Sequence, residues 1–526
     1  MLSNLFPPDV EGGAELLAGE IADGLTRRGH DVTVLTSATR VEAPGEQPRP
    51  RILRRLRRAG EARVDRSRPL WRQIGLPYRY YRRFHQPANA LALRQAVAEF
   101  SPDAVYIWEI TGLGVTSLLA ALPALRLPTV FHLGSYSLLY ARLPETDQSQ
   151  LRAPRLKRLL IGTVPTPAFT SCIAVSAAVR EAYARAGFDP ARIEVIHNGI
   201  APCFFDTAPA RAAVPTDGHA PWRLLFVGRL CAEKGVLTAL KALAQLPSDP
   251  GDPATGANDY QLDIVGDGDP AYLRLLRAYV SEQRLSERVT FHGRLPRERL
   301  IAFYDRSDFL LNTALWSEPF GLTTVEAMAR GLPVIGSRVG GTAEIITPGV
   351  NGLLVAPGDE HALVGAIERL VAEPALRARL SEAARRTALE RFTLEENIRR
   401  VARHLERAIT SDPTNIPTDT AIQAETRRAD VRARSDRRRR RHRCRVRRRR
   451  HRERGPQRTR RNQGRARHHP SRHGERFRPA GRNSRRPERG DGHHPATEAG
   501  DHRHGRDEWA SLPERVVGWR RRRGNR

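Results

Sequence analysis

Two glutamates, Glu318 and Glu326, flank a short glycine-containing stretch in the sequence WSEPFGLTTVEAMARGLPVIGS. A proline and Gly321 interrupt the chain before a run typical of a short helix from about Leu322 to Arg330, which ends at a glycine before a buried strand. The helix start leaves backbone N–H groups of Gly321, Leu322 and Thr323 free to stabilise a phosphate. The glutamates would then flank an anion site. Carboxylates accept hydrogen bonds from hydroxyl groups, so each glutamate could hold a polyol on its side of the anion.

Two cations, Arg229 and Lys234, follow another predicted strand and precede a helix in the sequence VGRLCAEKG. Cations at a helix start oppose the helix dipole unless an anion lies between them. A solvated surface is the alternative, but the chain has only three lysines against 85 arginines, which favours a specific role for Lys234. The cations predict a diphosphate site. Together with the glutamates they indicate a sugar nucleotide, with one carboxylate on the hexose and the other on the ribose.

A third loop, Phe6 to Glu15 (FPPDVEGGAE), places Gly12 and Gly13 at the start of a helix. Glycines there would let the backbone approach a ligand closely. A simple turn with a helix cap explains the same residues equally well.

Strand-like and helix-like segments alternate from residue 1 to about 410, which predicts parallel sheets covered on both faces. Ligands of such folds bind beyond the carboxyl ends of the strands, where all three loops would lie. The predicted strands form two series: 31–36, 104–108, 129–132, 172–175 and 193–196, then 224–227, 262–265, 289–291, 309–312 and 333–336.

Two doubly wound units in tandem are the simplest account of these series. Loop-like residues 198–221 separate the units, and an amphipathic helix at 394–409 would pack across both. A first strand is expected before Asn4, so the strand is cut short or the true start lies upstream. The predicted domains are 1–205, 206–392, the crossing helix 393–410 and the tail 411–526.

Residues 1 to 410 resemble retaining glycosyltransferases of the family-4 type, the glycosyl transferases group 1. The resemblance is carried by motifs in family order: PPDVEGGAE, AVSAAVREAY, VIHNGI, VGRLCAEKG, IVGDGD, VTFHGRLP, E-PFGLTTV-E, GLPVIGSRVGGTAEII and NGLLV. It implies a GT-B fold, in which two Rossmann-like α/β domains face a cleft. The implied reaction moves a hexose-type sugar from a nucleotide-diphosphate sugar to an unidentified glycan, lipid or small molecule, with retention of configuration, in polysaccharide or glycolipid biosynthesis.

The resemblance also implies roles for individual residues, and these agree with the charge argument. Arg229 and Lys234 match the diphosphate-binding cations, Glu318 the glutamate on the donor sugar, and Glu326 the one on the ribose; Gly321, Leu322 and Thr323 match backbone donors to sugar and phosphate, Gly12 and Gly13 the loop covering the donor, and Leu295 a backbone contact to the base. His132 falls where relatives keep a cleft histidine, although a strand-end histidine bonded to a carbonyl is the alternative. Arg297 stands where some relatives carry an acid, which leaves the base open.

No carboxylate pair with metal-ligand character is evident, and the cations remove the need for Mg²⁺, so we predict a metal-independent enzyme without a cofactor beyond its donor substrate. A GT-B epimerase or phosphorylase is the alternative within the enzyme class. A phosphorylase needs a lysine that carries pyridoxal phosphate, and neither Lys157 nor Lys241 lies in a supporting motif.

The segment Arg51 to Arg83 holds twelve arginines interleaved with Leu, Trp and Tyr. It suits the anionic headgroups of a membrane surface, and an arginine-rich solvated face is the alternative. No apolar run is long enough to span a membrane, no signal peptide is evident, and the four cysteines show no paired pattern. These features predict a cytoplasmic protein that can contact the inner face of the membrane.

The last part of the chain differs in composition. Residues 411–526 hold 37 Arg, no Lys and 14 acidic residues, so they carry +23 of the formal +30 and the preceding residues only +7. Such a segment is expected to be disordered. One hypothesis is a nucleic-acid-binding protein acting through this tail. Because aromatic residues and RGG repeats are scarce, we favour translation of GC-rich DNA out of frame.

Overall fold

The computed structural model describes residues 1–37, 50–59, 76–142, 159–161, 169, 171–206, 221–247 and 260–410. All of them belong to one compact unit, Met1–Thr418. Within these ranges no helix is both long and apolar enough to cross a membrane. The predicted disorder of the arginine-rich tail and most of the basic segment after residue 59 lie outside the described residues.

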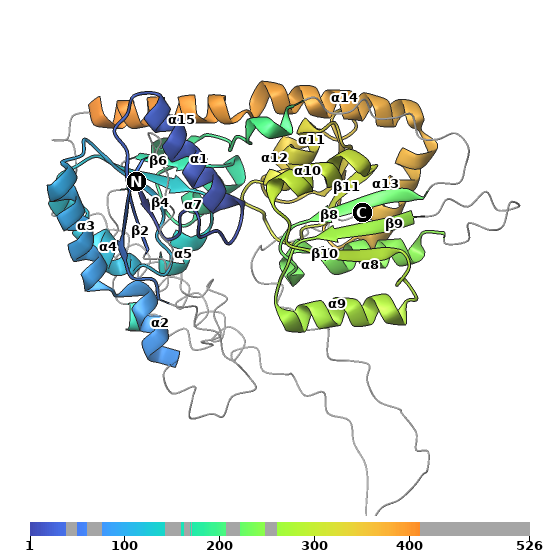
Figure 1. The fold of residues 1–526 in the computed structure, drawn as a ribbon, viewed down its shortest axis with the longest axis horizontal. Helices are drawn as coiled ribbons and strands as arrows, with labels where there is room; N and C mark the ends of the chain where they lie inside the picture. The colour runs from blue at the N-terminus through green and yellow to red at the C-terminus, as the bar shows by residue number, and fades with distance from the viewer. Residues whose placement is uncertain are drawn as a thin grey trace, which may run out of the picture. The chain divides into compact units, whose positions relative to one another are not determined.

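A seven-stranded parallel sheet forms the first half of this unit (Figure 1). Its strand order is β3-β2-β1-β4-β5-β6-β7. The bounds are β1 (Leu2–Ser3), β2 (Thr33–Ser37), β3 (Arg51–Leu56), β4 (Val105–Glu109), β5 (Thr129–Leu133), β6 (Ser171–Ala174) and β7 (Ile193–Val195). The strand expected before Asn4 is therefore present as a two-residue segment between β2 and β4.

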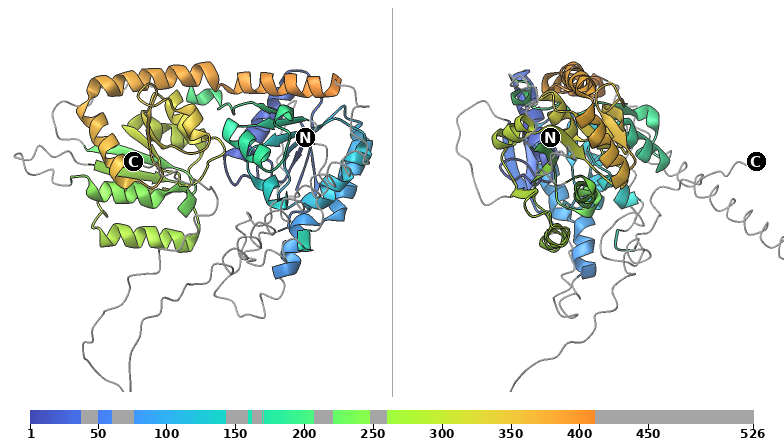
Figure 2. Two further views of the ribbon diagram at one scale, coloured as in Figure 1. Left: turned by 180° about the vertical axis from the view of Figure 1, so that it is seen from behind. Right: turned by 90° about the vertical axis from the view of Figure 1, so that its right-hand side faces the viewer.

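Helices bury both faces of this sheet, which explains its Val- and Ile-rich strands. Side chains of β4 alternate: Tyr106 and Trp108 join the cluster beneath α1 (Gly13–Arg27) and α15 (Leu394–Thr410), whereas Val105 and Ile107 face the other side. That side is covered by α2 (Leu76–Phe84), α3 (Pro87–Phe100), α4 (Val115–Ala121), α5 (Ser137–Arg142) and α7 (Ala177–Arg185). Figure 2 shows α15 beside α1, so the last described helix packs on the first sheet; the sequence predicted a helix packed across both units.

The second sheet has six parallel strands in the order β10-β9-β8-β11-β12-β13. They are β8 (Trp222–Val227), β9 (Tyr260–Val265), β10 (Val289–Gly293), β11 (Phe309–Asn312), β12 (Val334–Ser337) and β13 (Leu353–Val355). One face packs on α8 (Val236–Gln245), α9 (Pro270–Glu282) and α13 (Glu360–Ala372). The other packs on α10 (Arg297–Arg306), α11 (Leu322–Ala329) and α12 (Thr342–Ile345), and α14 (Pro374–Arg391) lies against α11.

Both sheets reverse their strand order once, and these reversals locate the ligand-binding edge of each sheet. The reversal falls between β1 and β4 in the first sheet and between β8 and β11 in the second. The loop with Gly12 and Gly13 follows β1, Lys234 follows β8, and Glu318 follows β11. Two doubly wound α/β units of this kind are the predicted architecture. The exact domain boundaries stay a prediction.

The arginines of β3 are engaged within the protein. Arg51 and Arg55 pair with Glu99 at 2.7 Å each, and Arg58, two residues after the strand, pairs with Glu11 at 2.6 Å. Arg54 donates to the carbonyl oxygen of Pro7. Four arginines of this part of the basic segment therefore have partners within the protein, whereas Arg57 is exposed.

Candidate functional site

The two loops that carry Lys234 and Glu318 meet at the switch point of the second sheet. Lys234 ends the 3-10 turn Ala232–Lys234, and Gly235 follows with a φ of +70°. A Cβ atom at Gly235 would overlap the carbonyl oxygen of Thr313, so only glycine allows this approach. The hydroxyl of Thr313 also donates to the carbonyl of Gly235 at 2.8 Å. The loop after β8 is thereby fixed against the loop after β11.

The Lys234 ammonium and the Glu318 carboxylate form an ion pair at this meeting point. Glu318 is only 8% exposed, and its Oε1 accepts the hydrogen bond from Lys234. Its Oε2 is buried and has no partner among the described residues, and the same holds for the indole Nε1 of Trp316. A buried polar atom without a partner costs free energy unless a ligand or water satisfies it. The loop therefore presents one hydrogen-bond acceptor and one donor that are unused.

The helix start predicted to bind an anion lies directly after this loop. Gly321 is the N-cap of α11 with a φ of +109°, and no side chain caps the helix. The start of α1 lies opposite, because a Cβ atom at Gly13 would stand 2.9 Å from Cδ1 of Leu322. The neighbouring Gly12 is the N-cap of α1, and its N–H donates to Glu15 at 2.8 Å. Thus the two glycine-containing helix starts come together from different sheets.

Glu326 lies on α11, with its carboxylate turned toward α10. It accepts a hydrogen bond from the Tyr304 hydroxyl at 2.7 Å. Burial raises the pKa of Glu326, although Tyr304 and the nearby Arg297 act in the opposite direction. Arg297 itself forms an ion pair with Glu20 of α1. The predicted ribose-binding carboxylate thus has a partner already, and the arginine noted in the sequence links the two halves of the unit.

The remaining predicted residues of the second sheet are placed less directly. Arg229 is exposed, and its side chain makes no hydrogen bond or ion pair within the described part of the chain. Leu295 is partly buried against the larger core, next to Arg294, which donates to the carbonyl of Val10 at 2.8 Å. Thr323 is partly exposed in the first turn of α11. The structure therefore joins Lys234 to Glu318 directly and leaves Arg229 as a neighbour in the same loop.

His132 lies at the end of β5 on the face that packs on α1 and α15. Its Nδ1 is 2.7 Å from the Tyr106 hydroxyl, and its ring stacks on Trp108 at 4.1 Å. Burial lowers the pKa of His132 to about 3, so the ring is neutral. Its Nε2 is buried and has no hydrogen-bond partner among the described residues. The sequence left open that this histidine bonds to a backbone carbonyl. In the structure its partner is the Tyr106 hydroxyl instead.

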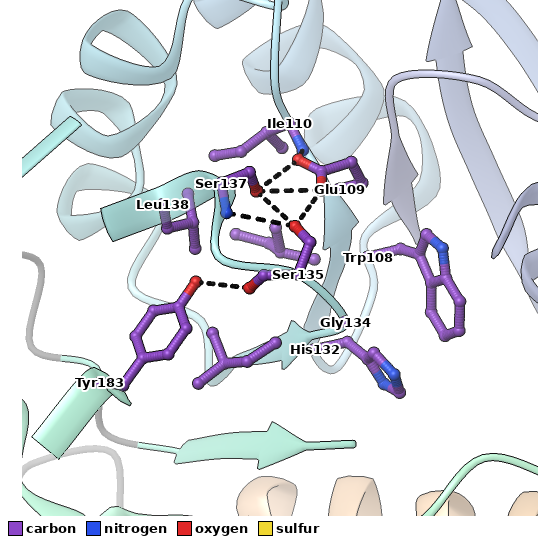
Figure 3. A pocket seen from close by; sticks show the side chains of 11 residues that line it. Trp108, Glu109, Ile110, His132, Gly134, Ser135, Ser137, Leu138 and Tyr183 are labelled. Carbon is purple, nitrogen blue, oxygen red and sulfur yellow. Dashed lines mark hydrogen bonds between the residues drawn. The ribbon is translucent and has the colours of Figure 1, made fainter. Parts of the chain in front are cut away.

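A small hollow at the carboxyl ends of β4 and β5 contains a polar cluster that sequence reasoning missed (Figure 3). The Glu109 carboxylate accepts from the hydroxyls of Ser135 and Ser137, each at 3.0 Å, and from the backbone N–H of Thr111 at 2.8 Å. The Tyr183 hydroxyl donates to the carbonyl of Ser135 at 3.0 Å. A glutamate directly after a predicted strand at the ligand-binding edge was the available signal.

Two other sequence expectations concern metals and lysines. The described ranges contain no group of three or more His, Cys, Asp or Glu side chains that could hold a metal ion. Lys241 lies on α8 with its side chain 44% exposed and pairs with Glu360 at 3.7 Å. The side chain is therefore partly open to solvent. Lys157 lies outside the described residues.

The two doubly wound sheets, with glycine-containing helix starts that meet, correspond to the GT-B fold. Solved structures of similar fold support this class. Residues 11–202 match the profile of Glycosyltransferase Family 4, and residues 214–387 match that of Glycosyl transferases group 1. The chain belongs to the group 1 glycosyltransferases of the family-4 type.

Three known proteins illustrate the relationship. D-inositol 3-phosphate glycosyltransferase of Acidothermus cellulolyticus is 37% identical over 205 residues, which cover 37% of this chain and 43% of that protein. Sucrose-phosphate synthase of Thermosynechococcus elongatus has a TM-score of 0.60 at 24% identity, covering 78% of this chain and 100% of that one. Anabaena HepE in complex with UDP-glucose has a TM-score of 0.55 at 24% identity, covering 77% and 100%. The chain spans less than half the length of the curated relative.

Proposed function

We propose that this protein transfers a hexose-type sugar from a nucleotide-diphosphate sugar to an acceptor, with retention of anomeric configuration. The observation that carries the proposal is the buried Glu318 carboxylate, which holds Lys234 through one oxygen and has an unused second oxygen. An ammonium, a free carboxylate oxygen and an uncapped helix start lie within one loop cluster. The ammonium and the helix start match the diphosphate of such a donor, and the carboxylate oxygen matches its sugar hydroxyls.

Charge development explains how these groups would act. When the bond between sugar and diphosphate breaks, negative charge grows on the diphosphate and positive charge on the anomeric carbon. Lys234, Arg229 and the N–H groups at Gly321, Leu322 and Thr323 stabilise the diphosphate, and such preorganised donors usually supply the largest contribution to catalysis. Glu318 orients the sugar through its free oxygen. We assign no metal to the reaction, because the two cations supply the required positive charge.

The other predicted residues complete the donor site in this proposal. Glu326 exchanges its bond with Tyr304 for the ribose hydroxyls or shares the carboxylate between them. Leu295 contacts the base through its backbone. Gly12 and Gly13 cover the donor, which the approach of Gly13 to Leu322 supports. His132 acts as a neutral group beside the sugar, and its low pKa excludes a role as a cationic acid near neutral pH.

We place the acceptor against the first sheet. The hollow around Glu109, Ser135 and Ser137 lies at the carboxyl ends of β4 and β5, where ligands of doubly wound sheets bind. Tyr136, between the two serines, bonds to Ser317 at 3.0 Å, one residue before Glu318. The loop that carries Tyr136 thus borders both the polar hollow and the loop between β11 and α11 that carries Glu318, here called the donor loop (residues 313–321).

A donor screen by thermal stabilisation tests the proposed function. Sugar nucleotides with different bases are added in excess, and the matching donor is expected to raise the melting temperature by several degrees; at about 100 times the dissociation constant a ligand adds about 2.7 kcal/mol of stability. The same rise is expected in EDTA, since the proposed site is cationic. The matching nucleoside monophosphate, which lacks the diphosphate, serves as the control. No response to any sugar nucleotide, or a strict need for divalent metal, contradicts the proposal.

We further propose a cytoplasmic location with contact to an anionic membrane through α2. Tyr78 and Tyr81 are 65% and 41% exposed there, and Arg82 is exposed beside them. Aromatic and cationic side chains on one short helix suit the membrane interface. The double variant Tyr81→Ser, Arg82→Glu is expected to lose flotation with liposomes containing anionic lipid. The matched pair Leu389→Ser, Arg386→Glu on α14 is the control, and flotation independent of anionic lipid contradicts the idea.

A further inference from the structure

Glu344 of α12, on the second sheet, caps the start of α7, a helix that packs on the first sheet. Its two carboxylate oxygens accept hydrogen bonds from the N–H groups of Ala177 at 2.8 Å and Ala178 at 2.7 Å. These residues are the first two of α7, and its own N-cap, Ser176, accepts only from the N–H of Val179. A carboxylate is well matched to free N–H groups at a helix start. The second half of the unit therefore holds α7 of the first half through one side chain.

The segment that carries Glu344 is equally fixed to the donor loop. The N–H of Gly341 donates to the carbonyl of Glu318 at 2.8 Å. Gly340 adopts a φ of +51°, and a Cβ atom there would overlap that same carbonyl. A Cβ atom at Gly341 would stand 2.5 Å from Cα of Phe320. With no side chains in between, the start of α12 moves with the backbone of the donor loop.

A third contact places Glu344 where the chain passes between the two halves. Nε2 of His197 lies 3.5 Å from Glu344, and the His197 ring packs near Phe320 of the donor loop and Phe392, which precedes α15. The carbonyl of His197 accepts from the side chain of Asn397 at 2.6 Å. Burial acts to raise the pKa of Glu344, but His197 and the two α7 N–H groups outweigh it and the pKa is lowered. The carboxylate is therefore ionised in this contact.

We propose that Glu344 is a positioning residue that keeps the donor loop aligned with the first sheet. The proposal rests on the proposed function and adds a residue that does not touch the donor. Lys234, Glu318 and the start of α11 lie on the second sheet and would bind the donor without Glu344. Gly12, Gly13 and His132 belong to the first sheet, so this contact helps to align them with the bound sugar. Loss of Glu344 should therefore lower turnover and leave donor affinity nearly unchanged.

The variant Glu344→Gln tests this split. Its amide keeps the size of the side chain but places an NH₂ group against one of the two N–H donors. The substrate is the nucleotide sugar selected by the donor screen, starting with UDP-glucose. We expect KM to change by less than about threefold and the donor-induced rise in melting temperature to stay close to that of the wild type. We expect kcat to fall roughly 10- to 100-fold, because small misplacements of reacting groups have effects of that size. Glu382→Gln, at an 80% exposed glutamate of α14, is the matched control.

The variant Ala177→Pro tests the same contact from the other side. Proline is tolerated at the first helical position, and the extended Ser176 suits the residue before it. It removes one N–H and crowds the carboxylate, so we expect the same loss of kcat, and the double variant with Glu344→Gln should lose little more. Amide hydrogen exchange at Ala178 should be faster in Glu344→Gln than in the wild type.

The possible failures are distinguishable. Normal kcat in both variants, or unchanged exchange at Ala178, overturns the role of Glu344 while the wild type still turns over its donor. Loss of the donor-induced thermal shift in folded Glu344→Gln also overturns it, because the residue would then belong to the donor site or the local fold. If the wild type neither binds nor hydrolyses any sugar nucleotide, the proposed function itself is wrong.

Discussion

Replacing Lys234 with alanine is expected to lower kcat/KM for the sugar nucleotide by roughly 100- to 1,000-fold, the range seen when one preorganised charge-stabilising donor is removed. Lys234 would lose its role on the diphosphate at the moment when negative charge develops there. The substitution also leaves Glu318 buried without its counterion. A buried carboxylate without its partner costs free energy, so the variant is also expected to be less stable than the wild type. Steady-state kinetics with the donor from the screen measures the loss.

Lys241→Ala is the matched control for this prediction. Lys241 is the other lysine in the described part of the chain, it lies on α8 just beyond the same loop, and its weak pair with Glu360 is solvent-exposed. Exposed ion pairs of this type contribute about 0 to 1 kcal/mol, so activity and melting temperature should stay near those of the wild type. A circular dichroism spectrum checks that Lys234→Ala is folded. Equal losses in both lysine variants would remove Lys234 from the proposed mechanism.

The residues predicted to do chemistry could be found because local sequence signals their backbone geometry. Glycine and proline mark the loop between β11 and α11, and Gly235 marks the turn that ends at Lys234. Sheets built of alternating strands and helices place such loops at one edge, which predicts that they meet. The ion pair itself joins residues 84 positions apart, and no local pattern specifies that contact.

Glu344 and Glu109 could not be selected from the sequence in the same way. Glu344 lies in the first turn of the short helix in GGTAEII, where an acidic residue suits the helix dipole, and its partners on α7 lie 166 and 167 positions away. Glu109 is distinguished only by the serines that the next loop brings to it. In both cases the informative feature is an acceptor matched to N–H or O–H donors of a different element, which only tertiary structure supplies.

Two of the four edge strands, β3 and β13, were the part of the fold that the sequence obscured. β3 reads as a basic segment, because an edge strand needs few buried side chains and tolerates charge. Only Leu53 and Leu56 of β3 are buried, whereas its arginines pair with Glu99 and neighbouring loops. β13, at the edge of the second sheet, has three residues and gives no periodic signal. The central strands were found because burial on both faces makes them continuously apolar.

Gly340→Ala is expected to remove most activity and to destabilise the protein by on the order of 3 kcal/mol, since the left-handed backbone disfavours a side chain and the added carbon would overpack the site. The new methyl group would overlap the carbonyl oxygen of Glu318 and stand 2.6 Å from its nitrogen. Backbone atoms cannot rotate away as a flexible side chain can. The Glu318 loop must therefore shift, and with it the carboxylate that pairs with Lys234. A drop in kcat of roughly 100-fold would correspond to a displacement of about 1 Å.

Gly349→Ala separates backbone strain from this displacement. Gly349 has a φ of +76°, compared with +51° for Gly340, but no atom lies within 4 Å of its hypothetical Cβ. Alanine there should cost only the intrinsic strain, about 1 to 2 kcal/mol, and leave kcat unchanged. Melting temperatures and kinetics of the two variants therefore distinguish the effects. If Gly340→Ala retains full kcat in its folded fraction, Glu318 does not depend on the position of this loop, and the rigid connection from Glu318 to Glu344 is wrong.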